Sequence, residues 1–372
     1  MLVINPSPYV SSLCYSIFRI EPYTSCSFNC RYCYGRWYSW KGGLKDIYTF
    51  EKISKRIHKD RLKTIPFRLS TLSDPFQYSE VDKRFSLRVL RIALKYSIPL
   101  IINTKSTLLM NEPWRNIIVR LGDKGLLVLQ VTLITLDEKV SRELEPYAPS
   151  PEERLKLIEY FSSERIPVVV RLQPYIPGIF RDEGEIEEYF KMLKSTGVIH
   201  VIVESLRCIK SDLEYYGKLL NTDAYQEDAW DIYPIRGGSI EVVKPRFNWL
   251  YREYIALRKY AEKYGISFAT CKEGFFSLHT APDCCGMFFL EDYVLRPTLY
   301  EAWLMYRRDR RVPSIDELLS EYCTQGNYIC SIRLVDYPRV IRKGIRNHEK
   351  MLGKVLCDRE LLGKVAFEFT YV

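Results

Sequence analysis

Three cysteines stand close together in the stretch SCSFNCRYCYGRW, residues 25–37, and their spacing is a strong chemical signal. A structural zinc site takes four protein ligands, usually as two separated pairs. Three thiolates on one loop can instead hold three irons of a 4Fe-4S cluster and leave the fourth iron open to a small molecule. The C-x3-C-x2-C spacing of Cys26, Cys30 and Cys33 therefore predicts an iron-sulfur cluster, with a zinc ion completed by a distant ligand as the alternative.

A second group of cysteines lies in the last third of the chain. Its members are Cys271, Cys284, Cys285, Cys323 and Cys330. Four thiolates here would hold a second iron-sulfur cluster or a structural zinc ion, which would stabilise an irregular region. The spacing is not a pair of C-x2-C motifs, so a disulfide and ordinary core cysteines stay open as alternatives. The odd total of eleven cysteines favours metal binding or thiol chemistry over a disulfide framework.

Short runs of β-branched residues alternate with segments of helical periodicity, and these elements must position the cysteines. Such runs are typical of parallel strands buried on both faces. The expected strands are 15–22, 66–71, 99–106, 126–135, 167–178 and 200–208, and the expected helices are 50–59, 83–97, 112–122, 150–164 and 183–197. The fourth helix opens on Ser150, Pro151 and Glu153, which is typical of a capping box. This alternation predicts an α/β barrel or an open doubly wound sheet.

The alternation stops at residues 222–240, an acidic and aromatic stretch that ends in Gly237 and Gly238. It predicts an inserted loop or a boundary. One more helix is expected at 246–265 and one more short strand at 266–271, as a further element of the same layer. The remainder is irregular except for a helix that begins at the capping box SIDE, residues 314–317. We therefore divide the chain into a first unit, 1–240, and a C-terminal extension, 241–372.

The cysteine loop follows the first expected strand, at the end where α/β barrels carry their active sites. With Tyr32 just before the last cysteine, its spacing resembles the signature of the radical S-adenosylmethionine (radical SAM) superfamily. The stretches STLSDPFQYSE, INTKS, TLDEKVSRELEPYAPSPEERL and RLQPYIPG follow in matching order, so that roughly residues 16–180 resemble the spore photoproduct lyase-like branch. The resemblance implies an α/β fold, a partial (β/α)6-type TIM barrel, with a less regular, cysteine-containing C-terminal extension.

The resemblance also implies roles for single residues. In radical SAM enzymes the open iron binds the amino and carboxylate groups of S-adenosylmethionine (SAM), and an electron from the cluster cleaves the sulfonium to give a 5'-deoxyadenosyl radical. Ser73 and Asp74 stand where family members bind the amino group. Lys105, with its long ammonium side chain, stands where the carboxylate is paired. Three strand residues are implied in contacts with the ribose, the rest of the cofactor or the substrate: Thr132, Arg171 and Gln173.

One position departs from the branch. Spore photoproduct lyases carry, near the motif that TLSDP resembles, a cysteine that returns a hydrogen atom to the product radical. The nearest counterpart here is Thr71, whose O–H bond is too strong for that task. Photoproduct repair is therefore in doubt. Cys208, at the end of the sixth expected strand, is a candidate substitute donor, and a small buried core residue is the alternative.

Composition narrows the setting of this 372-residue chain. Its 47% hydrophobic content is ample for a buried core, and neither a membrane span nor a signal peptide is evident, so we expect a cytosolic protein. Abundant Lys, Arg, Glu, Ile and Tyr with little Gln and Met is typical of a thermophile. The formal charge of +9 suits an anionic partner such as DNA or RNA, with basic runs at 56–63, 306–311 and 338–346; solvated helix faces are the alternative.

Three hypotheses for function follow. The first is a radical SAM enzyme that receives electrons from a ferredoxin or flavodoxin and acts on a large anionic substrate, most simply a nucleic acid. Such an enzyme needs single strands or flipped nucleotides, because a base inside a duplex is inaccessible to it. The second is a radical SAM maturase of proteins or peptides that uses an auxiliary cluster in the extension. The third is a non-catalytic, metal-stabilised nucleic-acid-binding protein.

Overall fold

Seven parallel strands form the central sheet, and they lie in the order β1-β2-β3-β4-β5-β6-β10. The computed structural model describes residues 2–37, 43–233 and 241–369, so Gly237 and Gly238 of the expected loop lie outside the described residues. The strands are β1 (Arg19–Ile20), β2 (Phe67–Leu69), β3 (Leu100–Thr104), β4 (Leu127–Thr132), β5 (Val168–Tyr175), β6 (His200–Ser205) and β10 (Ser267–Thr270).

The strand order decides between the two architectures that the sequence left open. A doubly wound sheet reverses its strand order at a switch point, whereas a barrel places successive strands side by side. Here each strand pairs with the next one in the chain, apart from β7 to β9, which form a separate sheet. The expectation of a partial TIM barrel is therefore confirmed, with seven strands instead of six. The seventh, β10, comes from the expected extension, so the sheet crosses the boundary drawn at residue 240.

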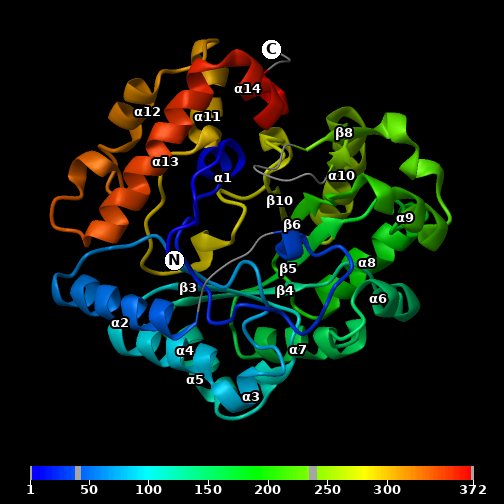
Figure 1. Ribbon diagram of the computed structural model, residues 1–372, viewed down its shortest axis with the longest axis horizontal. Helices are drawn as coiled ribbons and strands as arrows, with labels where there is room; N and C mark the ends of the chain where they lie inside the picture. The colour runs from blue at the N-terminus through cyan, green and yellow to red at the C-terminus, as the bar shows by residue number, and fades with distance from the viewer. Residues whose placement is uncertain (1, 38–42, 234–240, 370–372) are drawn as a thin grey trace.

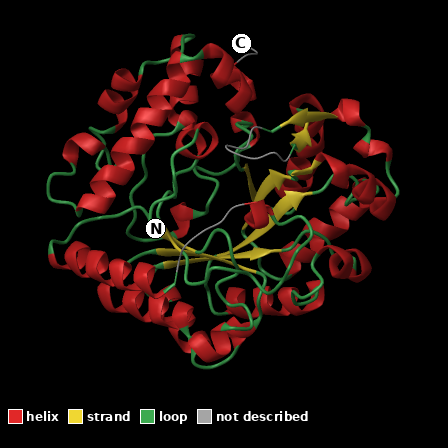
Figure 2. Cartoon of the chain, in the orientation of Figure 1, coloured by secondary structure: helices red, strands yellow, loops and turns green. Residues whose placement is uncertain are grey.

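Helices pack around the outer face of this sheet (Figure 1), and Figure 2 shows the strands enclosed by them. Ser150 accepts a hydrogen bond from the backbone of Glu153, whose side chain bonds back, so the expected capping box forms. The helices that follow strands β1 to β6 include α2 (Leu44–Lys59), α3 (Glu80–Lys83), α4 (Phe85–Tyr96), α5 (Trp114–Gly122), α6 (Glu138–Leu144), α7 (Pro151–Ser163), α8 (Glu183–Ser195), α9 (Leu213–Leu220) and α10 (Phe247–Lys263).

The inner face of the sheet carries polar groups in its middle. The Arg68 Nη1 donates to Asn103 Oδ1 at 3.0 Å and to Gln130 Oε1 at 3.2 Å, and Arg171 Nη1 donates to the same Gln130 oxygen at 2.9 Å. Buried polar groups need such partners, because an unpaired one costs free energy. This network links β2, β3, β4 and β5 below the ends of the strands.

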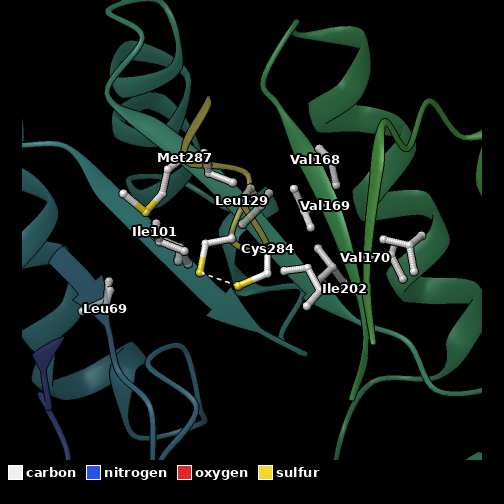
Figure 3. Close-up of a cluster of buried hydrophobic side chains, with 14 of the residues drawn as sticks. Leu69, Ile101, Leu129, Val168, Val169, Val170, Ile202, Cys284 and Met287 are labelled. Atoms are coloured by element: carbon white, nitrogen blue, oxygen red, sulfur yellow. Dashed lines mark hydrogen bonds between the residues drawn. The ribbon is translucent and has the colours of Figure 1, made fainter. Parts of the chain in front are cut away.

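The C-terminal part closes the open side of the barrel. Figure 3 shows Cys284 packed against side chains of β4, β5 and β6, so the loop that holds it lies against the inner face of the sheet. Beyond this loop the last helices build a smaller core of their own around Leu299, Trp303 and Leu352. These elements, with the N-terminal helix, are α1 (Pro8–Leu13), α11 (Leu299–Asp309), α12 (Ile315–Tyr322), α13 (Arg339–Cys357) and α14 (Arg359–Val365).

A small antiparallel sheet lies apart from the barrel strands. It consists of β7 (Cys208–Ile209), β8 (Trp230–Ile232) and β9 (Val242–Pro245), with β9 in the middle. Among the described helices, we find none with the length and apolar character that a membrane crossing requires.

Candidate active site

A pocket of about 310 Å³ lies at the carboxyl ends of the sheet strands. Because these ends meet at one edge of a parallel sheet, residues that are far apart in the chain line it together. The nine residues to which the sequence analysis gave a role in binding the cluster, the cofactor or the substrate at this site are among them: Cys26, Cys30, Cys33, Ser73, Asp74, Lys105, Thr132, Arg171 and Gln173. This volume is in the range that encloses one ligand of cofactor size.

The cysteine loop is held by its backbone. The Arg31 N–H donates to the Leu144 carbonyl at 2.9 Å, and the Gln77 side chain bonds both Ser25 and Ser27. A Cβ at Gly35 would lie 2.8 Å from the Leu72 oxygen, so glycine lets the cysteine loop and the 70–74 loop approach closely. In the part of the chain that the structure describes, no three His, Cys, Asp or Glu side chains are placed to hold one metal ion, and this includes the three cysteines of the loop.

Glu21 organises the loop that follows β2, and the sequence did not reveal this role. One carboxylate oxygen accepts from the Thr71 N–H and hydroxyl, both at 2.7 Å, and the other accepts from the Ser70 hydroxyl at 2.6 Å. The Ser70 hydroxyl also lies 2.6 Å from the Ser73 carbonyl oxygen. Glu21 is buried, so this small network holds the backbone of Ser73, a residue that lines the pocket.

Both carboxylate oxygens of Asp74 accept hydrogen bonds from residues at the end of β3. Its Oδ2 accepts from the Lys105 N–H at 2.7 Å, and its Oδ1 accepts from the Thr104 hydroxyl and the Phe76 N–H, both at 2.9 Å. Burial raises the pKa of this carboxyl, and the hydrogen bond from Lys105 opposes that rise. The Asp74 N–H donates to Cys26 Sγ at 3.4 Å. Asp74 therefore joins the cysteine loop to the residue that carries the pocket's ammonium group.

A buried carboxylate, Glu145, stands behind Lys105. Its oxygens accept from Arg154 and from the hydroxyl of Tyr32, and Lys105 Nζ lies 4.0 Å from Glu145 Oε1. The side chains of Glu145 and Arg154 are 0% and 1% exposed. Burial lowers the pKa of Lys105, but the charges of Cys30 and Glu145 outweigh it and raise that pKa. Because Glu145 and Arg154 come from two helical segments after β4, only the fold brings them to Lys105.

The far side of the pocket is formed by β4, β5 and the segment after β6. Arg154 Nη1 donates to the Thr132 carbonyl at 3.0 Å, which ties the end of β4 to α7. Burial opposes ionisation of Glu204, but Arg207 and Lys272 lower its pKa to about 2, so the pocket keeps one carboxylate there. Gln173 lines the pocket, and both polar atoms of its side chain are buried without a partner among the described residues.

Cys208 does not reach the pocket, so the prediction of a hydrogen donor there is wrong in its geometry. The strand β6 ends at Ser205, and Cys208 begins β7 of the separate small sheet, where it pairs with Val243. Its side chain is buried, which fits the alternative of a core cysteine. The chain turns away from the barrel after Ser205, and the β-branched run in the sequence does not show this turn.

The predicted ligand set of the C-terminal cysteines is also wrong in part. Cys323 and Cys330 form a disulfide, so neither thiol is available to a metal. Cys284 and Cys285 lie with their sulfurs 3.7 Å apart (Figure 3), and Arg68 Nη2 donates to Cys285 Sγ at 3.0 Å. Cys284 also lines a small cavity of about 10 Å³, which is about the size of one water. Cys271 follows β10 and is half-buried beside them.

Comparison with known sequences adds independent findings. The model of the Radical SAM superfamily matches residues 20–203 of this chain. Uncharacterized protein ORF301 of Acidianus two-tailed virus is 29% identical over 138 residues, which are 36% of this chain and 44% of that protein. Uncharacterized protein MJ0683 of Methanocaldococcus jannaschii is 24% identical over 182 residues, 45% of this chain and 64% of that protein. The match therefore spans less than two thirds of the length of either relative.

Comparison with solved structures shows a shared fold. A spore photoproduct lyase mutant is 16% identical with a TM-score of 0.53, over 68% of this chain and 77% of that chain. A mutant of the same enzyme with bound AdoMet and dinucleoside spore photoproduct is 17% identical with a TM-score of 0.52, over 68% and 76%. At this identity the likeness establishes the fold alone.

Proposed function

The chain belongs to the radical SAM superfamily, and on that premise we propose that the pocket is its active site and that Cys26, Cys30 and Cys33 hold the 4Fe-4S cluster. The observation that supports this is the lining of a single pocket by three thiols and by the residues whose types suit SAM. When bound, the cluster supplies the one-electron reduction of the SAM sulfonium. An electron donor such as ferredoxin or flavodoxin would deliver that electron.

The residues present fit SAM in charge. The Lys105 ammonium, held between Glu145 and the cysteine loop, pairs with the carboxylate of the methionine part. The Ser73 carbonyl oxygen lies 2.6 Å from the Ser70 hydroxyl, whose proton goes to Glu21, and it accepts from the amino group. Asp74 positions the backbone of Lys105 more than it binds the ligand itself, because its oxygens already accept three hydrogen bonds. Thr132, Arg171 and Gln173 are left for the nucleoside part and the substrate.

We propose a nucleic acid as the substrate, in a branch similar to the spore photoproduct lyases. A structural neighbour of that kind holds a dinucleoside photoproduct, and this chain has a net charge of +9 with the exposed Arg36 beside the pocket. A volume of about 310 Å³ leaves no room for a duplex, so the target nucleotide has to be single-stranded or flipped out. Among the described residues, the only thiols that line this pocket are those of the cysteine loop, which argues against repair by a cysteine hydrogen donor.

The two other hypotheses lose support. The maturase hypothesis rested on an auxiliary cluster in the extension, and two of its ligands are joined in a disulfide. The non-catalytic hypothesis conflicts with membership in an enzyme superfamily. The cytosolic location and the thermophilic source stay predictions from composition.

The decisive experiment is anaerobic reconstitution. Iron, sulfide and zinc are counted per chain in the parent, in Cys26→Ala/Cys30→Ala/Cys33→Ala, and in the control Cys323→Ala/Cys330→Ala, and 5'-deoxyadenosine is assayed with dithionite. We expect about four irons in the parent and the control, with 5'-deoxyadenosine, and neither in the triple variant. Irons that remain in the triple variant would reveal a second cluster. Zinc without iron in all three proteins would overturn the proposal.

A further inference from the structure

The exposed side of helix α13 carries a continuous stripe of basic side chains. Six exposed residues form it: Arg339, Arg342, Lys343, Arg346, Lys350 and Lys354. At 100° per residue these positions fall within a sector of about 120°, so all six side chains leave the helix on the same side. At 1.5 Å per residue the stripe is about 22 Å long. In Figure 1, α13 lies with α11, α12 and α14, away from the barrel strands.

The stripe is not neutralised by neighbouring carboxylates. None of the six makes an ion pair with another described residue. The single carboxylate in α13, Glu349, is buried and accepts from the Ser331 N–H at 2.8 Å, although Arg346 lies within reach of its field. Asp336 and Asp358 flank the two ends of the helix and are outside the stripe. The six positive charges therefore repel one another, and an anionic partner would lower this electrostatic free energy.

The other basic runs of the chain differ in this respect. In the run 306–311, Arg308 bonds Asp309 and Glu321, and Arg311 bonds Glu317. In the run 56–63, Arg56 pairs with Asp60 and Lys63 with Asp292. In each of these two runs, two of the four Lys and Arg side chains are therefore ion-paired. The Lys and Arg side chains of the third run, which lies in α13, are not ion-paired with described residues and can bind an anionic partner.

The stripe favours a nucleic acid over a membrane. A helix that lies in a membrane surface buries an apolar face among the lipids. The apolar face of α13 is already buried in the protein, through Ile341, Ile345 and Leu352. What remains outside is a straight row of positive charge about 22 Å long. A nucleic acid strand carries one negative charge per 3.4 Å of duplex axis, so a row of this length can face several phosphates.

We propose that the basic stripe of α13 is a docking surface for the phosphate backbone of the nucleic acid substrate, separate from the pocket. The inference rests on the proposed function for the nature of the substrate. No residue of α13 lines the pocket; the helix packs on the N-terminal segment, where His348 Nε2 lies 2.8 Å from the Ile4 oxygen. The stripe supplies affinity and leaves the reading of the target nucleotide to the pocket.

The test measures binding as a function of salt. Anisotropy of a fluorescein-labelled DNA duplex, and of the matching single strands of DNA and RNA, is recorded from about 50 to 200 mM salt. The variant is Arg342→Gln/Arg346→Gln/Lys350→Gln, in which Gln keeps a high helix propensity. The control, Lys156→Gln/Lys218→Gln/Lys364→Gln, removes the same charge from exposed lysines that are already paired with Glu152, Glu214 and Glu360.

We expect the variant to lose about 2.7 from the log-log slope on duplex DNA, at 0.9 per phosphate contact, and the control to keep the parent's slope. Substrate-free cleavage of SAM stays unchanged in both. A variant that keeps the parent's slope while the parent binds overturns the stripe and leaves the proposed function standing. Equal losses of slope in the variant and the control would mean that only net charge matters, which overturns the stripe as a specific docking surface. A parent that binds no nucleic acid, or one whose stripe binds only anionic lipid vesicles, overturns the docking surface together with the nucleic-acid substrate.

Discussion

At the scale of single residues, Lys105 is the cation of the pocket around which several charged and aromatic groups are arranged. Its backbone is held by Asp74, its ammonium lies near the buried Glu145, and it stands over the ring of Tyr32 at 5.5 Å from the centroid. An ammonium on a flexible stem would otherwise sample many positions. The partners restrict that freedom in advance, so less entropy is lost when an anionic ligand group binds.

Replacement of Lys105 tests its assignment to SAM. Lys105→Ala should weaken SAM binding by about 10- to 100-fold, because charge-assisted hydrogen bonds contribute about 1.5–3 kcal/mol. Iron content should not change, since Lys105 is no cluster ligand. Calorimetric titration of the reconstituted protein measures the affinity, and the exposed Lys139→Ala serves as control. An unchanged dissociation constant would remove Lys105 from the site.

Glu145 is a positioning residue, and its loss should first be seen in stability. Glu145→Gln leaves the buried guanidinium of Arg154 without its counter-charge, which typically costs about 3–5 kcal/mol. Urea unfolding of the apoprotein measures this cost. The double variant Glu145→Gln/Arg154→Met should recover part of it, because the orphaned charge is gone. Equal stability of the single variant and the parent would contradict the view of a buried charge pair.

At the scale of elements, Glu273 ties the end of β6 to the segment after β10. Its Oε1 accepts from the N–H and the hydroxyl of Ser205, both at 3.0 Å, while its Oε2 is buried without a partner among the described residues. Burial and the charge of Glu204 raise the pKa of Glu273 to about 8, against the opposing charge of Arg207. The two strand ends are therefore joined through a carboxyl that favours its protonated form.

This joint makes stability depend on pH. The pKa of Glu273 is raised from 4.5 on folding. Its contribution to the free energy of unfolding is therefore fully present below about pH 4.5 and is lost as the pH rises to about 8. The slope is at most about 1.4 kcal/mol per pH unit for this one proton. Glu273→Gln should remove that slope and leave the variant more stable than the parent at about pH 8. Thermal midpoints across this range measure it, with the exposed Glu159→Gln as control, and a parallel pH profile in variant and parent would refute the assignment.

At the scale of the whole molecule, the C-terminal third completes the barrel. It supplies the strand β10, and the Cys285 carbonyl accepts from Gln130 Nε2 at 2.7 Å in the middle of the sheet. The large buried cluster includes Phe268 and Met287 together with residues of β1 to β6. The polar network that positions Arg171 thus depends on a loop that the sequence assigned to an extension.

Truncation tests this dependence. A chain that ends at residue 240 should fail to form a soluble, cooperatively unfolding protein, because it exposes the edge of β6 and the inner face of the sheet. Circular dichroism and size-exclusion chromatography compare it with the full chain. Co-expression with residues 241–372 should restore the fold. A stable monomer of 1–240 would instead establish the boundary as a true division into domains.

The sequence alone determined the features that depend on neighbouring residues. Three such features are local patterns: the cysteine spacing, the capping box at Ser150 and the alternation of strands with helices. The local structure that each pattern predicts follows from backbone geometry and burial. The placement of Ser73, Lys105 and Thr132 around one pocket also followed, because carboxyl ends of parallel strands share one edge.

Only the tertiary structure decided which distant groups meet. Three contacts depend on the direction that the chain takes after each element, which the local sequence does not predict. They are Glu21 with the 70–73 loop, Glu145 with Lys105, and the disulfide of Cys323 with Cys330. Cys208 turned away from the barrel for the same reason. The basic runs looked alike in sequence, and the fold separated them, because a surface charge is paired or unpaired only by what lies opposite it in space.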